Sequence, residues 1–172
     1  MPFALSLYAL VAIVIISALV IAFGAAMAFV KSRKQDRGIR KNIFVTLLCI
    51  AIAAISWILN MGWLRLSMTF LLIPFFHAII FFLVNIFSLD CVQKSKKSKS
   101  IYIMLCITYL LPYLLLPDFG DTNEGYLFFG LIHVHGDIPV VFGAAAWIAA
   151  LAHIVLLILQ TAKIIKMRKS GE

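Results

Sequence analysis

Two histidines separated by one residue are the most ligand-like feature of the sequence. His133 and His135 are followed by Asp137, and three more carboxylates come before them, at Asp118, Asp121 and Glu124. Side chains at positions i and i+2 point the same way only in an extended chain, because a helix turns them about 200° apart. Two such histidines and a carboxylate would hold Zn²⁺ with one position open for water. The pattern therefore predicts a zinc site and, with it, a metal-dependent membrane enzyme.

The same segment also has a plainer interpretation. No HExxH motif and no spaced pair of cysteines accompanies the histidines, and short motifs of this kind arise by chance. The segment would then be a solvated polar loop, in which Gly136-Asp137 leads into a helix with Pro139 in its first turn. Zinc binding and helix capping are both open on this evidence.

Two further histidines lie inside apolar segments. His77 and His153 fall near the middle of stretches long enough to cross a membrane, where ionisable residues are costly and usually face the bundle interior. Asn85 lies within about 80° of His77 on its helix, at 100° per residue. Facing imidazoles would form an intramembrane site that relays protons or binds a metal. The alternative is neutral histidines hydrogen-bonded to neighbouring helices, with Tyr109 or Asn60 as partners, since no acidic residue lies in any span to complete a relay.

One basic residue stands apart from all the others. Arg65 either pairs with an acidic residue of the 117–138 segment, clamping that segment over the bundle, or extends to lipid headgroups. No nucleophile elbow, phosphate-binding loop or dinucleotide fingerprint is present in the sequence, which disfavours the common enzyme classes that use them.

Five apolar segments must position these residues. A spanning helix needs about 20 apolar residues, and we place spans at residues 3–30, 42–59, 66–89, 101–116 and 139–162. Hydrophobic residues make up 64% of the chain, against about 45–50% in soluble domains. The sequence therefore predicts an all-α integral membrane bundle of five helices, with Pro74 and Pro112 kinking the third and fourth.

Small and weakly polar residues recur at helical spacing along several spans. On the second span the steps are three and four residues, through Thr46, Cys49, Ala53, Ser56 and Asn60. The fourth span carries Tyr102, Cys106, Tyr109 and Tyr113, and the fifth carries Ala146, Ala150, His153, Leu157 and Gln160. Helices in lipid associate through such faces, so these stripes are predicted to point into the bundle.

The basic residues give an orientation. All but one of the fifteen lysines and arginines fall in three clusters at residues 31–41, 94–99 and 163–169. Cytoplasmic loops hold this excess, which predicts cytoplasmic basic loops and C-terminus, an outer N-terminus and an outer loop at 117–138. The apolar stretch 126–132 within that loop is too short to span, and a re-entrant or interfacial turn is expected there. The plasma (inner) membrane is the expected location.

These features favour a non-catalytic multi-pass protein that acts by binding a partner in or at the membrane. The bilayer itself, another membrane protein or a second copy of the chain would be the partner. A proton or metal-ion transporter using His77 and His153 is the first alternative, and a zinc enzyme at the outer face is the second. Nucleic acid is not expected despite the net charge of +8, because no aromatic residues interleave the basic clusters.

Overall fold

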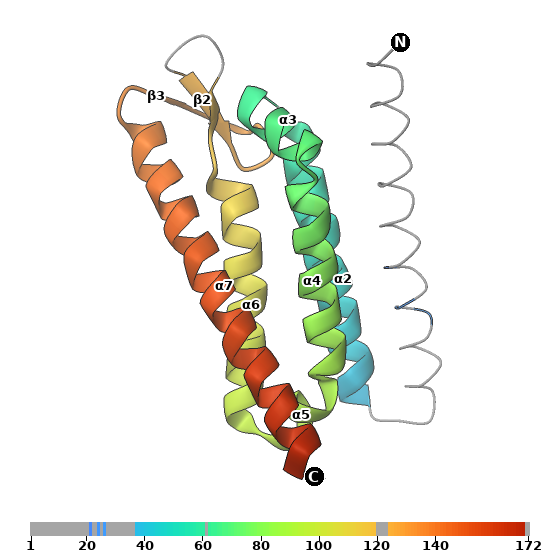
Figure 1. The fold of residues 1–172 in the computed structure, drawn as a ribbon. Helices are drawn as coiled ribbons and strands as arrows, with labels where there is room; N and C mark the ends of the chain where they lie inside the picture. The colour runs from blue at the N-terminus through green and yellow to red at the C-terminus, as the bar shows by residue number, and fades with distance from the viewer. Residues whose placement is uncertain are drawn as a thin grey trace.

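The computed structural model describes residues 37–60, 62–119 and 124–170, together with Ile21, Gly24 and Ala26. These residues form a helical bundle with a small sheet at one end (Figure 1). The predicted first span, 3–30, lies almost entirely outside the described residues, and so does Asp121. The bundle fits the predicted helical membrane class, whereas the sheet was not predicted.

Within the described part of the chain, three single helices are long and apolar enough to cross a membrane. They are α2 (Arg37–Leu59), α6 (Lys96–Leu115) and α7 (Ile138–Ser170). They overlap the spans predicted at 42–59, 101–116 and 139–162, but α2 and α6 begin five residues earlier and α7 continues to Ser170. Helix α6 contains Pro112 and continues past it as far as Leu115.

The predicted third span is broken into two helices. Helices α3 (Trp63–Phe70) and α4 (Ile73–Phe87) meet at an angle of 68°. Leu72 has a left-handed backbone at the break (φ 60°, ψ 15°), and Pro74 lies in the first turn of α4. The bend therefore falls before the proline, because proline fits the first turn of a helix better than its interior. The short helix α5 (Leu89–Lys94) follows α4.

The segment after α6 folds into a three-stranded antiparallel sheet. Its strands are β1 (Asp118–Phe119), β2 (Glu124–Leu127) and β3 (Ile132–His135), in the order β1-β2-β3. A tight turn joins β2 to β3, with positive φ at Phe128, Phe129 and Gly130. Residues 126–132, where a re-entrant or interfacial turn was expected, thus belong to a β-hairpin whose turn lies at Phe128–Gly130. The apolar residues of β2 and β3 lie on paired strands. The pairing satisfies their backbone N–H and C=O groups with hydrogen bonds.

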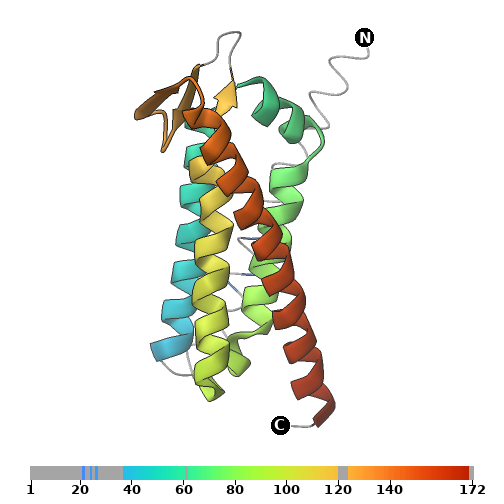
Figure 2. The ribbon, with the colours of Figure 1, turned by 90° about the vertical axis from the view of Figure 1, so that its left-hand side faces the viewer.

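The predicted stripes form the core of the bundle. All five stripe residues of α2 are buried, as are all four of α6. On α7, Ala146, His153 and Gln160 are buried, while Ala150 and Leu157 are only partly covered. Helix α6 lies between α2 and α7 (Figure 2). Large apolar side chains on the outward faces stay exposed, among them Ile58, Ile107 and Leu151, which suits contact with lipid tails.

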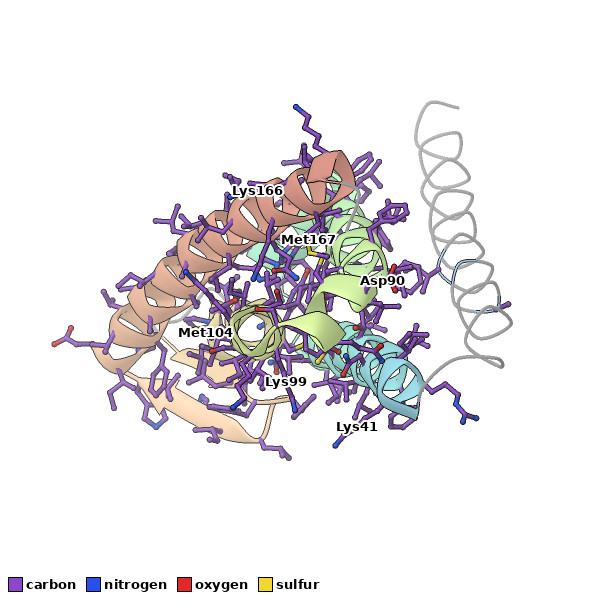
Figure 3. The ribbon with its side chains drawn as sticks, turned by 90° about the horizontal axis from the view of Figure 1, so that it is seen from below. Lys41, Asp90, Lys99, Met104, Lys166 and Met167 are labelled. Carbon is purple, nitrogen blue, oxygen red and sulfur yellow. The ribbon has the colours of Figure 1, made fainter. Side chains whose placement is uncertain are left out.

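The two ends of the bundle differ in character. The start of α2, the start of α6 and the end of α7 lie together at the end opposite the sheet (Figure 1). Figure 3 looks at this end and labels Lys41 on α2, Lys99 on α6 and Lys166 on α7. We call it the basic end and the other the sheet end.

Candidate functional site

The histidines of α4 and α7 meet inside the bundle. Their ring centroids are 4.8 Å apart, and the rings stand nearly perpendicular to each other at 82°. His153 is fully buried, and His77 is partly buried. The two helices both run from the sheet end toward the basic end (Figure 1). His77 and His153 therefore lie at the same depth in the bundle, although they are far apart in the sequence. The arrangement brings together the two imidazoles that the sequence placed near the membrane centre.

His77 is held by a tyrosine of α6. Its Nδ1 lies 2.8 Å from Oη of Tyr113, and the two rings stack at 14° with centroids 5.7 Å apart. Tyr109 also packs on His77, with centroids 4.9 Å apart. The phenol of Tyr113 donates or accepts this hydrogen bond according to the tautomer of His77.

His153 is held by Thr108, which also lies on α6. Its Nδ1 lies 3.1 Å from Oγ1 of Thr108, while that hydroxyl lies 2.8 Å from the carbonyl oxygen of Met104. A hydroxyl has one proton, and the shorter hydrogen bond to Met104 uses it. Thr108 therefore accepts from Nδ1 of His153, which leaves Nε2 of the neutral ring as an acceptor. Nε2 is buried and has no hydrogen-bond partner among the described residues.

An aromatic wall completes this cluster. Tyr109 stacks on Phe81 with centroids 3.9 Å apart and planes at 6°, and both rings lie beside His153 at 5.6 and 5.7 Å. The hydrogen-bond partners of the histidines are thus Tyr113 and Thr108, rather than Tyr109 or Asn60. Tyr113 was on the predicted α6 stripe and could have been chosen, but Thr108 lies off that stripe and gave no signal.

The two asparagines lie away from the rings. Asn85 is eight residues beyond His77 on α4, which puts it about 12 Å nearer the basic end at 1.5 Å per residue. Asn60 directly follows α2 at the sheet end, where its Oδ1 is 3.5 Å from the position that a Cβ on Gly130 would occupy. Both amides are buried without a hydrogen-bond partner among the described residues. Asn85 therefore belongs to a different level of the bundle from the histidine cluster.

Two hollows open on His77. A cavity of about 190 Å³ lies toward the sheet end, between Trp57, Pro74, Tyr113 and Ala146. A groove of about 840 Å³ runs between α4 and α7, lined by side chains such as Phe76, Ile80, Ile154 and Ile158. His77, Ile73, Trp147 and Ala150 line both. His77 therefore presents a polar group where the half-open cavity meets a groove on the apolar outer surface.

Arg65 is completely buried at the sheet end. Its guanidinium donates hydrogen bonds to the carbonyl oxygens of Ser56 (2.8 Å), Tyr113 (3.1 Å) and Leu116 (2.6 Å). It also lies over the ring of Trp57, 5.2 Å from the centroid. These carbonyls lie at the ends of α2 and α6, where the last backbone acceptors of a helix need donors from outside it, although the carbonyl of Ser56 also accepts from the amide of Asn60 (3.1 Å). Arg65 thus ties two helix ends together, and the predicted extension to headgroups does not occur.

His133 and His135 lie on β3, in extended chain. The rings of His133 and His135 are 4.3 Å apart, and Tyr126 stacks on His133 at 4.7 Å. The register sets Glu124 opposite His135. Asp118 is opposite Tyr126 in the same way. Strand pairing thus provides the fold-back that a zinc site would need.

The described side chains do not complete a metal site. Among them, no three His, Cys, Asp or Glu residues form a group that could hold a metal ion. Asp137 is exposed in the turn before α7, and its carbonyl oxygen accepts from the amide of Val140 (3.2 Å). Asp137 thus lies directly before the first residue of α7, Ile138.

Comparison with known proteins adds no assignment. No protein-family model matches the chain, and no match was found among curated proteins or among solved structures.

Proposed function

We propose that the protein is a non-catalytic, intramembrane binding protein for a lipid-like molecule. The polar head of that molecule contacts His77 and Tyr113, and its apolar chain lies in the groove between α4 and α7. The observation that carries this proposal is the position of His77, which lines both the half-open cavity and the groove. A ligand would enter sideways from the bilayer, through the groove.

The lining of the groove specifies the ligand. From Ala150 to Ile165 the groove follows α7 for about 22 Å, at 1.5 Å per residue. This is most of the roughly 30 Å hydrocarbon thickness, so the ligand is chain-shaped rather than compact. None of the described residues that line the two hollows carries a fixed charge. The head group is therefore uncharged and able to form hydrogen bonds.

Native mass spectrometry with monooleoylglycerol tests this proposal. Ala150→Phe would fill the junction of the two hollows, so we expect the lipid adduct to be lost while the melting temperature is retained. Ala152→Phe is the matched control, because Ala152 is exposed two residues along the same helix. Equal binding by both variants, or no binding by the wild type, would contradict the proposal. Phosphatidylglycerol should bind more weakly because of its charge.

Proton or metal-ion transfer is the second candidate function. The contact of His77 with His153 at 4.8 Å supports it, since facing imidazoles can pass a proton or share an ion. His153→Phe keeps the bulk and removes the nitrogen atoms. Proton flux into reconstituted vesicles should be abolished by this change if the pair conducts. If vesicles with the wild-type protein show no proton flux over a range of pH gradients, lipid binding remains the better-supported function.

We further propose five spans, an outer N-terminus and a cytoplasmic basic end in the plasma membrane. The support is that the described lysines and arginines other than Arg65 belong to the segments that meet at the basic end, such as Lys41, Lys99 and Lys166 (Figure 3), which is the arrangement that the positive-inside rule favours. The sheet end, with its hairpin, would then face the outside.

A further inference from the structure

Polar side chains without partners occupy the half of the bundle nearest the basic end. Asn85 on α4, Ser98 on α6 and Gln160 on α7 are exposed by 1%, 0% and 0%. Neither polar atom of either amide, nor the hydroxyl of Ser98, has a hydrogen-bond partner among the described residues. The same is true of Nε2 of His153. Three helices therefore turn unpaired polar groups into one half of the interior.

These groups lie at successive depths. Gln160 is seven residues beyond His153 on α7 and Asn85 is eight beyond His77 on α4, so both lie about 10–12 Å below the histidines. Ser98 precedes Thr108 by ten residues on α6, which runs the opposite way (Figure 1). That is about 15 Å, or one turn below the amides. The exposed Lys96 and Lys97 follow at the basic end.

Lipid cannot supply the missing hydrogen bonds. Polar groups buried in hydrocarbon must be satisfied within the protein or by enclosed water, and a buried water makes about three hydrogen bonds to such groups. The two amides could bond each other across α4 and α7, but Ser98 and Nε2 of His153 would still need partners. Water satisfies all four, because it both donates and accepts.

We propose that this half of the bundle holds a file of water molecules that leads from the basic end to Nε2 of His153. The file gives the histidine cluster aqueous access from one side of the membrane only. The titratable rings beside His153 are His77 from α4 and Tyr109 from α6. The inference goes beyond lipid binding, because the file lies inside the bundle and the groove opens on its surface.

Cysteine accessibility tests the water file in the full chain in liposomes. The native Cys49, Cys91 and Cys106 are first replaced by alanine. Gln160→Cys is then compared with Leu159→Cys, which is at the same depth but 52% exposed on the outward face. A small positively charged methanethiosulfonate needs a hydrated thiolate, so Gln160→Cys should react faster by on the order of 100-fold. The reaction should occur only with reagent on the side of the basic end.

Radical footprinting of the wild type tests the same proposal without substitution. Hydroxyl radicals made from enclosed water oxidise the side chains beside it. In nanodiscs, Leu156, one turn before Gln160, should be oxidised more than the lipid-facing Leu151. Equal oxidation of the two leucines, or equal reaction rates of the two cysteine variants, would overturn the water file. That outcome would leave an amide pair between Asn85 and Gln160 as the structural explanation.

Discussion

The guanidinium of Arg65 gains its importance from where the helices end. It is fully buried, and it donates to three backbone carbonyls from two helices. Those carbonyls lie at C-termini, where the helix dipole favours a positive charge. A cation that seemed suited to a loop or a headgroup therefore acts as a shared cap.

Replacing Arg65 should destabilise the protein more than replacing an exposed arginine does. Hydrogen bonds with a charged partner contribute about 1.5–3 kcal/mol each, so Arg65→Met is expected to cost about 3 kcal/mol or more. Arg65→Lys should recover only part, because an ammonium lacks the planar fork. Arg40→Met, at an exposed site on α2, is the control. Unfolding in detergent measures all three, and wild-type stability of Arg65→Met would show that the cap contributes little.

The zinc prediction also belongs to single residues. If His133 and His135 are ligands, each change to alanine should lower the zinc retained after dialysis, because each removes a first contact to the metal. Elemental analysis of protein purified without a histidine tag is the measurement. Glu124→Gln tests the residue opposite His135. A wild type that stays metal-free when Zn²⁺ is supplied would remove the enzyme interpretation.

At the scale of elements, the break between α3 and α4 depends on Leu72. Leucine pays a conformational cost in the left-handed region, and glycine does not. Leu72→Gly is therefore expected to stabilise the protein by about 1 kcal/mol. The lost side chain costs little, because lipid solvates leucine as well as a protein core does.

Leu71→Gly is the matched control for this change. Leu71 has φ −80° and ψ 1°, which leucine adopts without strain, so glycine there should be neutral or destabilising. Thermal unfolding in the same detergent compares the two variants. A loss of stability with Leu72→Gly as large as with Leu71→Gly would mean that the bend stores no strain.

Helical periodicity predicted the elements better than it predicted their joints. The α2 stripe from Thr46 to Asn60 is buried along its whole length, because a three-and-four spacing fixes which face can meet a neighbour. Pro74 signalled an interruption, but a leucine at positive φ gives no sequence signal for where the chain bends. The sheet was missed because its pairing depends on contacts between β1, β2 and β3 rather than on local pattern.

The histidine cluster was predictable only in part. Apolar surroundings identified His77 and His153, since ionisable residues within spans usually face inward. Their meeting depends on the relative positions of α4 and α7, which no spacing within either helix determines. Thr108 could not be found from its own helix, because it lies off the buried stripe of α6.

For the whole molecule, the orientation is the prediction of greatest reach. Single cysteines at the exposed Ser100 and Asp137 should be labelled from opposite sides of the membrane. We expect an impermeant reagent to reach Asp137→Cys in intact cells, and Ser100→Cys only after permeabilisation, because basic loops stay in the cytoplasm. The reverse labelling pattern would show that the basic end faces outward and that the proposed orientation is wrong. Ser98 is unsuitable for this test, because it is buried.

The length of α7 has a consequence for the surrounding bilayer. Its 33 residues measure about 50 Å, while the hydrocarbon region is about 30 Å thick. An upright α7 that enters at Ile138 leaves the hydrocarbon near Ile158, so Lys163, Lys166 and Lys169 stand among or beyond the headgroups. Each lysine near an anionic surface gains about 1 kcal/mol. Membranes rich in anionic lipid should therefore hold α7 upright, and neutral membranes should let the helix tilt and so alter the width of the groove beside α4.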